Sequence, residues 1–585
     1  MTNELEDVSA RFDDERAGRH LALSLHNPHR VMVAYRLDQV RDVIRESESE
    51  AQRGAWVAGF VAYEAAPAFD DALAVRDAKP GLPLAWFAAF RDASDAAATP
   101  GGAYALGQWS SDVDEDKYAK SIALIHELIT SGDTYQTNRT FLLRAPFEGD
   151  STTFYRDLLD AQRGGYHSYL STGDRTIVSA SPELFFRWDG RRIETRPMKG
   201  TMPRGRWDQE DRQTRELLLT SEKNRAENVM IVDLLRSDVG RVARFGTVKV
   251  ERLFDLERFE TVWQMTSTIA AETRPDVGLV DILAAMFPCG SVTGAPKART
   301  MEIITDMETS PRGVYCGAIG LLAPPGSGRP KAEFSVAIRT AEISDGICEY
   351  GVGGGIVHES TADDEYQEAM VKAKVLRRRR TDVTLLETMR WDPETGVWLL
   401  DRHLDRLRTS ARYFDIDVPE AEIARLLSAV ESDTPLWVRL LVPERGEPDL
   451  ASRPLESSRA IIGLAVDDLP IDRWDVFRYH KTTDRSVYDA AAARHPGADD
   501  VVLVNDRREV VETTRSNIAV KIDDEWLTPP LAAGCLPGVY REELIDFRSL
   551  REHPLFLHDL LDAAEEIAVV NSVRGWVPAK LLHGA

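Results

Sequence analysis

The sequence changes character once, at a run of four arginines, and this change limits how the chain can fold. The stretch DDEYQEAMVKAKVLRRRR ends at Arg380 and has the pattern of a charged helix, whereas a β-like run, VTLLETMRW, begins at Val383. A chain of 585 residues is also too long for one hydrophobic core. We therefore expect three parts: a β-rich part over 1–110, a main first region over 111–380 and a second region over 381–585.

Charge and cysteine content exclude several classes of protein. The chain has 96 acidic and 72 basic side chains, a formal net charge of -24, which repels phosphate backbones and anionic lipid. We therefore expect no nucleic-acid or membrane partner, and we interpret Arg377–Arg380 as a solvated helix end. No run of about 18 apolar residues appears, and the acidic start is not that of a signal peptide. The four cysteines form no CxxC pair, which is typical of a reducing, cytoplasmic setting.

Helical and strand-like patterns alternate in both regions. Residues 114–132 predict a helix with Asp114 as its N-cap, an isoleucine stripe and Gly132 as its end. After the arginine run, helices are expected over 401–414 and 419–431, and strands near 436–442 and 460–466. The fold class is therefore α/β or α+β in both regions.

Acidic side chains stand within helical patterns of the first region. Glu227 lies in ENVMIVDLLRSDVGRV, and Glu365, Glu368 and Lys372 are spaced to share one helical face. Separated carboxylates of this kind suit Mg²⁺, which keeps several water ligands. The alternative is that they are solvent-facing charges paired with basic side chains.

Two glycine-rich segments and one lysine complete the polar features of this region. GSVTGAPK (290–297) precedes an apparent helix, and YGVGGGIVHES (350–360) places three glycines after a strand. Each is either an anion-binding loop or a tight turn, and neither matches a phosphate loop or dinucleotide fingerprint. Lys199, in RPMKGTMPRG, is either a surface charge or an amine that burial makes nucleophilic.

Eight motifs of the first region resemble, in order, those of the chorismate-utilising enzymes. They are YQTN (135–138), SASPELFF (179–186), PMKGT (197–201), ENVMIVDLLRSD (227–238), GSVTGAPK (290–297), RGVYCGAIG (312–320), FSVAIRT (334–340) and GGGIVHES (353–360). The family includes anthranilate synthases, isochorismate synthases and aminodeoxychorismate synthase component I. The resemblance implies a two-sheet αβ sandwich with outer helices, one Mg²⁺ and chorismate as the substrate.

The resemblance also implies the roles of individual residues. Mg²⁺ would be held by Glu227, Glu365 and Glu368. Chorismate would be bound by Thr293, Tyr315, Arg339, Gly353, Gly354, Gly355 and Lys372. The metal would neutralise one carboxylate of this diacid, and the basic side chains would bind the other.

Lys199 is similar to the lysine of aminodeoxychorismate synthases, whereas anthranilate synthases usually carry a small residue there. The resemblance implies that its amine attacks the ring while Glu183 protonates the departing hydroxyl, and that ammonia then displaces Lys199. Burial would have to keep the amine neutral and the carboxyl protonated. Gln264 replaces a histidine of many relatives and cannot carry a proton, and Cys289 is interpreted as a small buried side chain. No glutaminase motif is visible, so ammonia must come from solution or from a separate glutamine amidotransferase subunit.

The second region resembles the fold-type IV pyridoxal-phosphate enzymes, which include D-amino-acid aminotransferases and aminodeoxychorismate lyase. The motifs are YHKTTDRSVYDAA (479–491), LVNDRREVVETTRSNIAV (503–520), TPPLAAGCLPGVYREEL (528–544) and VVNSVRG (569–575). The resemblance implies an α+β domain that binds pyridoxal 5′-phosphate and that can pair with a second copy as a homodimer. The implied cofactor ligands are Lys481 for the aldehyde, Glu512 for the pyridine nitrogen, and Arg406, Gly538, Val539 and Ser572 for the phosphate.

This second resemblance lacks its usual beginning. Free-standing members carry an extra strand and a DRGxxxGDGxFET-like stretch, whereas here the match begins at LLET. Either the first region supplies the missing piece or the cofactor domain is incomplete.

Together the two regions predict a bifunctional enzyme that makes 4-aminobenzoate, a folate precursor. The first would make aminodeoxychorismate, and the second would eliminate pyruvate from it. One alternative is an anthranilate- or isochorismate-type synthase joined to a class IV aminotransferase, and another is a non-catalytic chorismate-binding scaffold.

Overall fold

The computed structural model describes residues 7–14, 21–95, 101–162, 164–373, 376, 382–457 and 459–582. The four arginines at 377–380 lie outside these residues. The chain forms two compact units: the first holds residues 1–203 and 215–380, and the second holds residues 204–214 and 381–585. Among the described residues, no helix has both the length and the apolar character needed to cross a lipid bilayer.

Two ten-stranded sheets form the first unit. One contains, in spatial order, β16 (Gly294–Ala295), β8 (Gln136–Gly149), β20 (Ile347–Ile356), β19 (Thr340–Ser344), β10 (Thr176–Ser181), β9 (Tyr166–Thr172), β1 (Val8–Asp14) and β2 (Leu21–His26), with β6 (Tyr104–Leu106) and β7 (Ser110–Ser111) paired to β8. The other contains β13 (Met198–Pro203), β15 (Val262–Glu272), β12 (Arg192–Arg196), β11 (Leu184–Trp188), β18 (Ala332–Val336), β17 (Ala318–Leu322), β4 (Trp56–Val61), β5 (Ala85–Phe90) and β3 (Arg30–Ala34), with β14 (Lys249–Arg258) paired to β15.

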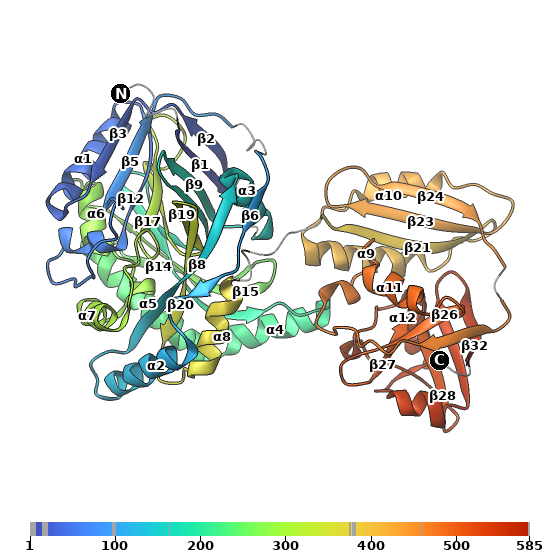
Figure 1. Cartoon of the computed structure of the whole chain (residues 1–585). Coiled ribbons are helices and arrows are strands. Elements are labelled where there is room, and N and C mark those ends of the chain that lie inside the picture. Colours follow the sequence, from blue (N-terminus) through green and yellow to red (C-terminus); the bar gives the residue numbers. More distant parts are fainter. Residues whose placement is uncertain are drawn as a thin grey trace. The chain divides into compact units, whose positions relative to one another are not determined.

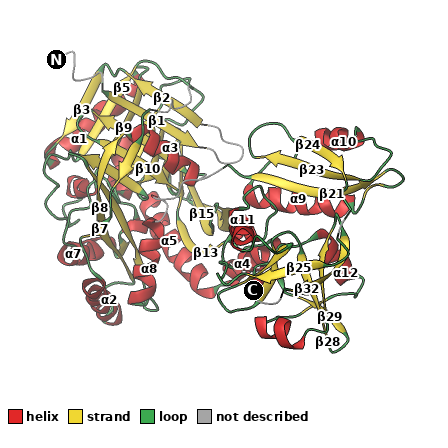
Figure 2. Ribbon diagram, turned by 45° about the vertical axis from the view of Figure 1, so that its right-hand side comes forward, coloured by secondary structure: helices red, strands yellow, loops and turns green. Residues whose placement is uncertain are grey.

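Helices cover the outer faces of these sheets (Figures 1 and 2). They are α1 (Leu37–Gln52), α2 (Glu115–Thr130), α3 (Ser151–Ala161), α5 (Glu222–Gly240), α6 (Leu279–Met286), α7 (Lys297–Met307) and α8 (Ala362–Ala373). Strand β4 is apolar on both faces because both faces are buried. Val57 and Val61 pack with α1 and α6, whereas Ala58 and Phe60 pack between the two sheets. A strand buried on both faces reads as a continuous apolar run, as WVAGFV does here.

Local sequence signals set the helix boundaries. The predicted helix over 114–132 is α2: the Asp114 carboxylate accepts a hydrogen bond from the Lys117 amide at 2.8 Å, which caps the helix. Ile122 and Ile125 are buried on its inner face, and Gly132 follows its end with φ +80°. One expectation needs correction, because Gly353–Gly355 lie within β20 and do not follow it.

Two further sheets form the second unit. The smaller contains β22 (Gly396–Val397), β21 (Thr384–Asp392), β23 (Leu436–Pro443) and β24 (Asp449–Pro454). The larger contains β27 (Val510–Thr513), β26 (Asp500–Val504), β25 (Ile462–Val466), β32 (Gly575–Leu581), β31 (Glu566–Asn571), β28 (Asn517–Ile522), β29 (Glu525–Thr528) and β30 (Arg551–Glu552). The helices are α9 (Leu400–Phe414), α10 (Glu420–Ser428), α11 (Ser486–Arg494) and α12 (Val539–Asp546), and α9 packs on β21 (Figure 1). Helix α4 (Asp208–Thr220) begins within residues 204–214 of this unit.

Candidate active sites

Lys199 lies in β13, at a bend that neighbouring amide side chains hold in place. Gly200 has φ +95°, the Asn228 amide donates to the Lys199 carbonyl at 3.3 Å, and Gln264 Nε2 donates to the Gly200 carbonyl at 2.8 Å. Gln264 therefore fixes backbone, which needs no proton transfer. Burial lowers the pKa of Lys199, although Glu227 and Glu183 raise it. More of this amine is neutral than at the surface.

The glycines of β20 are the point at which side chains from other elements converge. A Cβ atom on Gly355 would lie 2.8 Å from Lys199 Nζ and 2.3 Å from Gln136 Nε2. A Cβ atom on Gly354 would lie 3.1 Å from a Glu365 oxygen and 3.6 Å from Lys372 Nζ. Any side chain at these positions would fill the space beside the Lys199 and Lys372 amines. We call Gly353–Gly355 the glycine cradle.

Gln136, at the start of β8, belongs to this site and was missed by the sequence analysis. Its side chain is fully buried, and neither its amide oxygen nor its amide nitrogen has a hydrogen-bond partner among the described residues. A buried amide without partners is costly unless a ligand satisfies it. The signal was present in the YQTN motif, but one glutamine at the polar start of a strand does not indicate where its side chain points.

Glu183, between β10 and β11, provides a buried carboxyl near Lys199. It is 3% exposed, and one carboxyl oxygen has no hydrogen-bond partner within the described part of the chain. Burial raises its pKa to about 7, although Ser291 and Lys199 lower it. A substantial fraction therefore carries a proton near neutral pH, as a general acid must.

The three predicted metal ligands influence one another electrostatically. Burial raises the pKa of Glu227 and of Glu365, and the negative charge of Glu368 raises both further. Burial also raises the pKa of Glu368, but the Lys372 ammonium, 2.8 Å away, outweighs this and lowers it. In the described ranges, no three acidic, His or Cys side chains enclose a metal position by themselves. The set fits a hydrated Mg²⁺ completed by substrate oxygens, because Mg²⁺ rarely takes an all-protein cage.

The remaining predicted substrate ligands are Arg339, Tyr315 and Thr293. The Arg339 guanidinium makes no ion pair or hydrogen bond within the described residues. Burial lowers its pKa, and a substrate carboxylate would be a suitable partner. Tyr315 is buried against Gly351, beside the cradle. Thr293 is fully buried, and its hydroxyl lies 3.2 Å from the Cys289 carbonyl, so it shapes its own loop.

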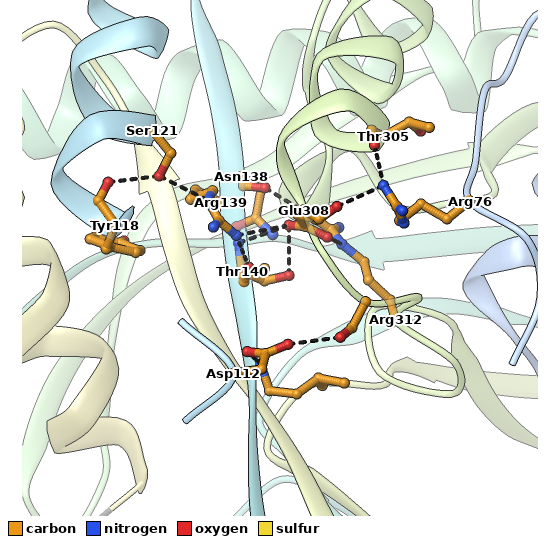
Figure 3. Close-up of polar contacts among 12 residues, drawn as sticks. Arg76, Asp112, Tyr118, Ser121, Asn138, Arg139, Thr140, Thr305, Glu308 and Arg312 are labelled. Carbon is orange, nitrogen blue, oxygen red and sulfur yellow. Dashed lines mark hydrogen bonds and ion pairs between the residues drawn. The ribbon is translucent and has the colours of Figure 1, made fainter. Parts of the chain in front are cut away.

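A buried ion network supports β8, the strand that pairs with the glycine cradle in the same sheet (Figure 3). Glu308 accepts hydrogen bonds from the Thr140 amide at 2.9 Å, the Thr140 hydroxyl at 2.8 Å and two Arg312 nitrogens at 2.8 and 2.9 Å. Arg312 also donates to the Asn138 carbonyl at 2.8 Å. Because residues 138–140 pair with Gly355–Gly353, this network fixes one wall of the site.

Lys481 is the predicted catalytic lysine of the second unit, as Lys199 is of the first. The Leu386 amide of β21 donates to the Lys481 carbonyl at 2.9 Å, and the Thr483 amide donates to the Thr384 carbonyl at 3.0 Å. Burial and the charge of Arg406 lower the pKa of its amine to about 8. An amine that is neutral near physiological pH can add to an aldehyde.

Glu512, in β27, is buried among hydrogen-bond donors. One carboxylate oxygen accepts from the Tyr488 hydroxyl at 2.8 Å and Arg478 at 3.2 Å, and the other accepts from the Leu536 amide at 3.1 Å and Asn517 at 3.3 Å. Burial raises its pKa, although Arg478 and Tyr488 lower it. A pyridine N–H at this carboxylate would have to share or replace one of these donors.

Arg406 is held by a second carboxylate that the sequence analysis did not assign. Glu387, 2% exposed, accepts from two nitrogens of Arg406 at 2.8 and 2.5 Å and lies 2.6 Å from His403. Burial raises the pKa of Glu387, but Arg406 and His403 outweigh it and lower the pKa to about 2. The remaining Arg406 N–H groups are consistent with a phosphate ligand. Its Nη1 donates to the carbonyl of Pro537, the residue before Gly538.

The other predicted phosphate ligands lie on this unit's loops and helix starts. Gly538 is the N-cap of α12 and Val539 is its first residue, so both amides belong to the positive end of a helix. Ser572 is buried at the end of β31. These groups fit a phosphate, and Lys481 fits an aldehyde, so the unit is suited to pyridoxal phosphate.

Comparison with known proteins assigns both units. Residues 95–378 match the chorismate binding enzymes, and residues 384–582 match the amino-transferase class IV family. We call these matched regions the chorismate binding domain and the class IV domain, after the families that they resemble. Both resemblances drawn from the sequence are confirmed, as is the mixed α/β and α+β fold class. Lys199 and the glycine cradle belong to the chorismate binding domain, and Lys481 belongs to the class IV domain.

Curated relatives cover mainly the chorismate binding domain. Aminodeoxychorismate synthase component 1 of Salmonella typhimurium is 42% identical over 264 residues, 45% of this chain and 57% of that protein. An aminodeoxychorismate synthase of Streptomyces griseus is 38% identical over 351 residues, 60% of this chain and 44% of that protein. The chain thus spans about half the length of these relatives.

A solved structure matches the first unit. Anthranilate synthase component I of Streptococcus pneumoniae has a TM-score of 0.55 and 25% identity, and the match covers 63% of this chain and 92% of that one.

Proposed function

We propose that the chain makes 4-aminobenzoate in two steps. The chorismate binding domain would convert chorismate and ammonia into 4-amino-4-deoxychorismate, and the class IV domain would release pyruvate from that product. The observation that carries the first step is the approach of the Lys199 amine to the glycine cradle, near Glu183, one oxygen of which has no partner in the described part of the chain.

Lys199 would act as a nucleophile and Glu183 as its acid. The lone pair of Nζ forms a bond to the ring carbon beside the carboxylate-bearing carbon, both conjugated ring double bonds shift, and the C–O bond breaks as the hydroxyl leaves with the proton of Glu183. Ammonia then bonds to the carbon that lost the hydroxyl and expels the Lys199 amine. The lowered pKa of Lys199 and the raised pKa of Glu183 support both roles. Gln136 would hydrogen-bond substrate or ammonia.

Mg²⁺ would be held by Glu227, Glu365 and Glu368, where it would neutralise a substrate carboxylate. Lys372 stands beside Glu368, and its Nζ donates to the Gly353 carbonyl at 3.0 Å, which orients it over the cradle. The half-buried guanidinium of Arg339 supports a second carboxylate contact. Ammonia would come from solution or from a separate glutamine amidotransferase.

In the class IV domain, bound pyridoxal phosphate would supply an electron sink. Arg406 and the start of α12 would bind its phosphate. Lys481, neutral in part near pH 8, would bond to the cofactor and later move the proton at the carbon next to the substrate nitrogen. Glu512 would be the carboxylate facing the ring nitrogen.

Product analysis tests both steps. The full chain is incubated with chorismate, Mg²⁺ and ammonium, with and without pyridoxal phosphate. We expect 4-amino-4-deoxychorismate without the cofactor, and 4-aminobenzoate with equimolar pyruvate when it is present. Release of the ortho isomer alone would show an anthranilate-type synthase, and chorismate that is bound but never consumed would show a scaffold. Accumulation of aminodeoxychorismate despite cofactor would refute the second step.

A further inference from the structure

The class IV domain includes a segment that comes from within the sequence of the chorismate binding domain. Residues Arg204–Thr214 pack with residues 381–585, although they directly follow β13, which carries Lys199. We call this segment the strap. The second unit is therefore built from two separate stretches of chain.

Internal contacts give the strap a fixed shape. Arg204 donates twice to Asp211, both at 2.7 Å, and the Gly205 amide donates to the same carboxylate at 2.9 Å. A Cβ atom on Gly205 would lie 2.1 Å from the Asp211 amide nitrogen, so this close turn requires glycine. Arg206 is paired in the same way with Glu210, at 2.7 and 2.9 Å. Contacts inside the strap thus hold the side chains of both arginines in position.

Arg206 and Trp207 contact the residues that lead to Lys481. Arg206 Nη1 donates to the Tyr479 hydroxyl oxygen at 3.0 Å and to the Arg473 carbonyl at 3.1 Å. Its guanidinium also lies over the Trp474 ring at 4.4 Å, and the Trp207 ring stacks on Tyr479 with centroids 5.1 Å apart. Tyr479 is 1% exposed, and Arg206 and Trp207 of the strap both contact it.

Arg204 supports the next residue, His480, through an aromatic ring. Its guanidinium lies 4.3 Å from the Tyr413 ring centre, and that ring lies 4.4 Å from His480. His480 is buried, with its Nδ1 3.0 Å from the Ser410 hydroxyl. Burial lowers the pKa of His480 to about 3, so the imidazole is neutral and stays in this hydrogen bond.

Tyr479 and His480 directly precede Lys481, and β21 holds the residues that follow. The backbone of Lys481 is therefore fixed on one side by hydrogen bonds to Thr384 and Leu386, and on the other by the strap. We propose that the strap is a positioning element of the class IV domain, in which Arg206 and Trp207 act through Tyr479 to hold Lys481 in place for the aldehyde of pyridoxal phosphate. This inference depends on the function proposed above for the class IV domain.

The experiment measures cofactor binding by the full chain. Apo protein is titrated with pyridoxal phosphate and followed by visible absorbance, and lyase turnover is measured with supplied aminodeoxychorismate. The variants are Arg206→Ala, Arg206→Lys and Tyr479→Phe. Arg212→Ala is the matched control, because Arg212 lies in the same strap with its side chain 71% exposed and paired with the neighbouring Asp208. Chorismate consumption reports on the integrity of the other domain.

We expect Arg206→Ala to weaken cofactor binding about tenfold or more, since a hydrogen bond to a charged group contributes about 1.5–3 kcal/mol and tenfold corresponds to about 1.4 kcal/mol. Arg206→Lys should restore part of this loss. The effects of Arg206→Ala and Tyr479→Phe should be less than additive, because both remove the same contact. Arg212→Ala should bind cofactor normally, and chorismate consumption should be unchanged in all variants.

Two results would overturn the inference. One is wild-type cofactor affinity in both Arg206→Ala and Tyr479→Phe. The other is full additivity of their effects, which would mean that Arg206 does not act through Tyr479. A wild-type chain that takes up no cofactor would instead refute the proposed function of the domain, so the two failures are distinguishable.

Discussion

Glu308→Gln is the sharpest test of the buried ion network behind the glycine cradle. The carboxylate of Glu308 is 4% exposed and accepts four hydrogen bonds, two of them from the Arg312 guanidinium. Glutamine keeps one accepting oxygen, but its NH₂ group would face donors and could pair with none of them. The guanidinium of Arg312, a residue that is itself 5% exposed, would lose its only carboxylate partner among the described residues.

The expected cost follows from the charge that the substitution removes. Removing the charged partner of a buried ion pair costs about 3–5 kcal/mol in the free energy of unfolding, because the Arg312 charge is left without its counter-ion. Thr140 and the Asn138 carbonyl would also shift, because both depend on this network. The Michaelis constant for chorismate should therefore rise, while lyase turnover of supplied aminodeoxychorismate should not change.

Urea unfolding, followed by tryptophan fluorescence, measures the stability change, and initial-rate assays measure the Michaelis constant. Glu302→Gln is the matched control, since Glu302 is on the same helix, α7, with a half-exposed side chain paired to Arg299. It should cost less than about 0.5 kcal/mol. A loss of under about 1 kcal/mol in Glu308→Gln would show that the network does not carry the energy assigned to it.

Four further predictions concern the two sites. Lys199→Ala should lower ammonia-dependent consumption of chorismate by about a thousandfold or more, with lyase turnover intact; a wild-type rate would exclude covalent catalysis. At a constant concentration of free ammonia, consumption should fall as pH rises through about 7, because Glu183 loses its proton there, and Glu183→Gln should abolish this limb of the pH profile. Chelation of Mg²⁺ should stop the synthase step and spare the lyase step, and Glu368→Gln should raise the Mg²⁺ concentration needed; loss of both steps would argue against a metal site confined to Glu227, Glu365 and Glu368. Cofactor uptake should increase as pH rises through about 8, where the Lys481 amine becomes neutral, and Lys481→Ala should remove visible absorbance; a pH-independent uptake would contradict the lowered pKa of Lys481.

Local signals in the sequence were sufficient for elements whose ends are capped by near neighbours. Asp114 caps α2 by accepting a hydrogen bond from the amide three residues further on. The periodic isoleucines indicate the inner face of the helix, so this helix could be predicted. Lys199 and Lys481 were singled out because whole motifs surround them. Their roles in catalysis remain predictions.

Partners that are distant in sequence could not be predicted. Gln136 lies in the polar run QTNRT and Glu387 precedes Thr388, and no local pattern tells whether such a side chain faces a ligand or an ion-pair partner. Arg206 contacts Arg473, 267 positions away, and Glu308 contacts Thr140, 168 positions away. The three glycines were expected after a strand, but they lie within β20, where side chains from other elements approach them.

The strap has a practical consequence for anyone who wishes to divide this protein into two enzymes. A cut at the arginine run would assign residues 204–214 to the wrong product. The C-terminal fragment would then expose the ring of Tyr479 to water, and the N-terminal fragment would carry Arg204 and Arg206 without the aromatic rings of Tyr413 and Trp474 on which they lie. A successful split would need a graft of this short peptide, or its supply in trans.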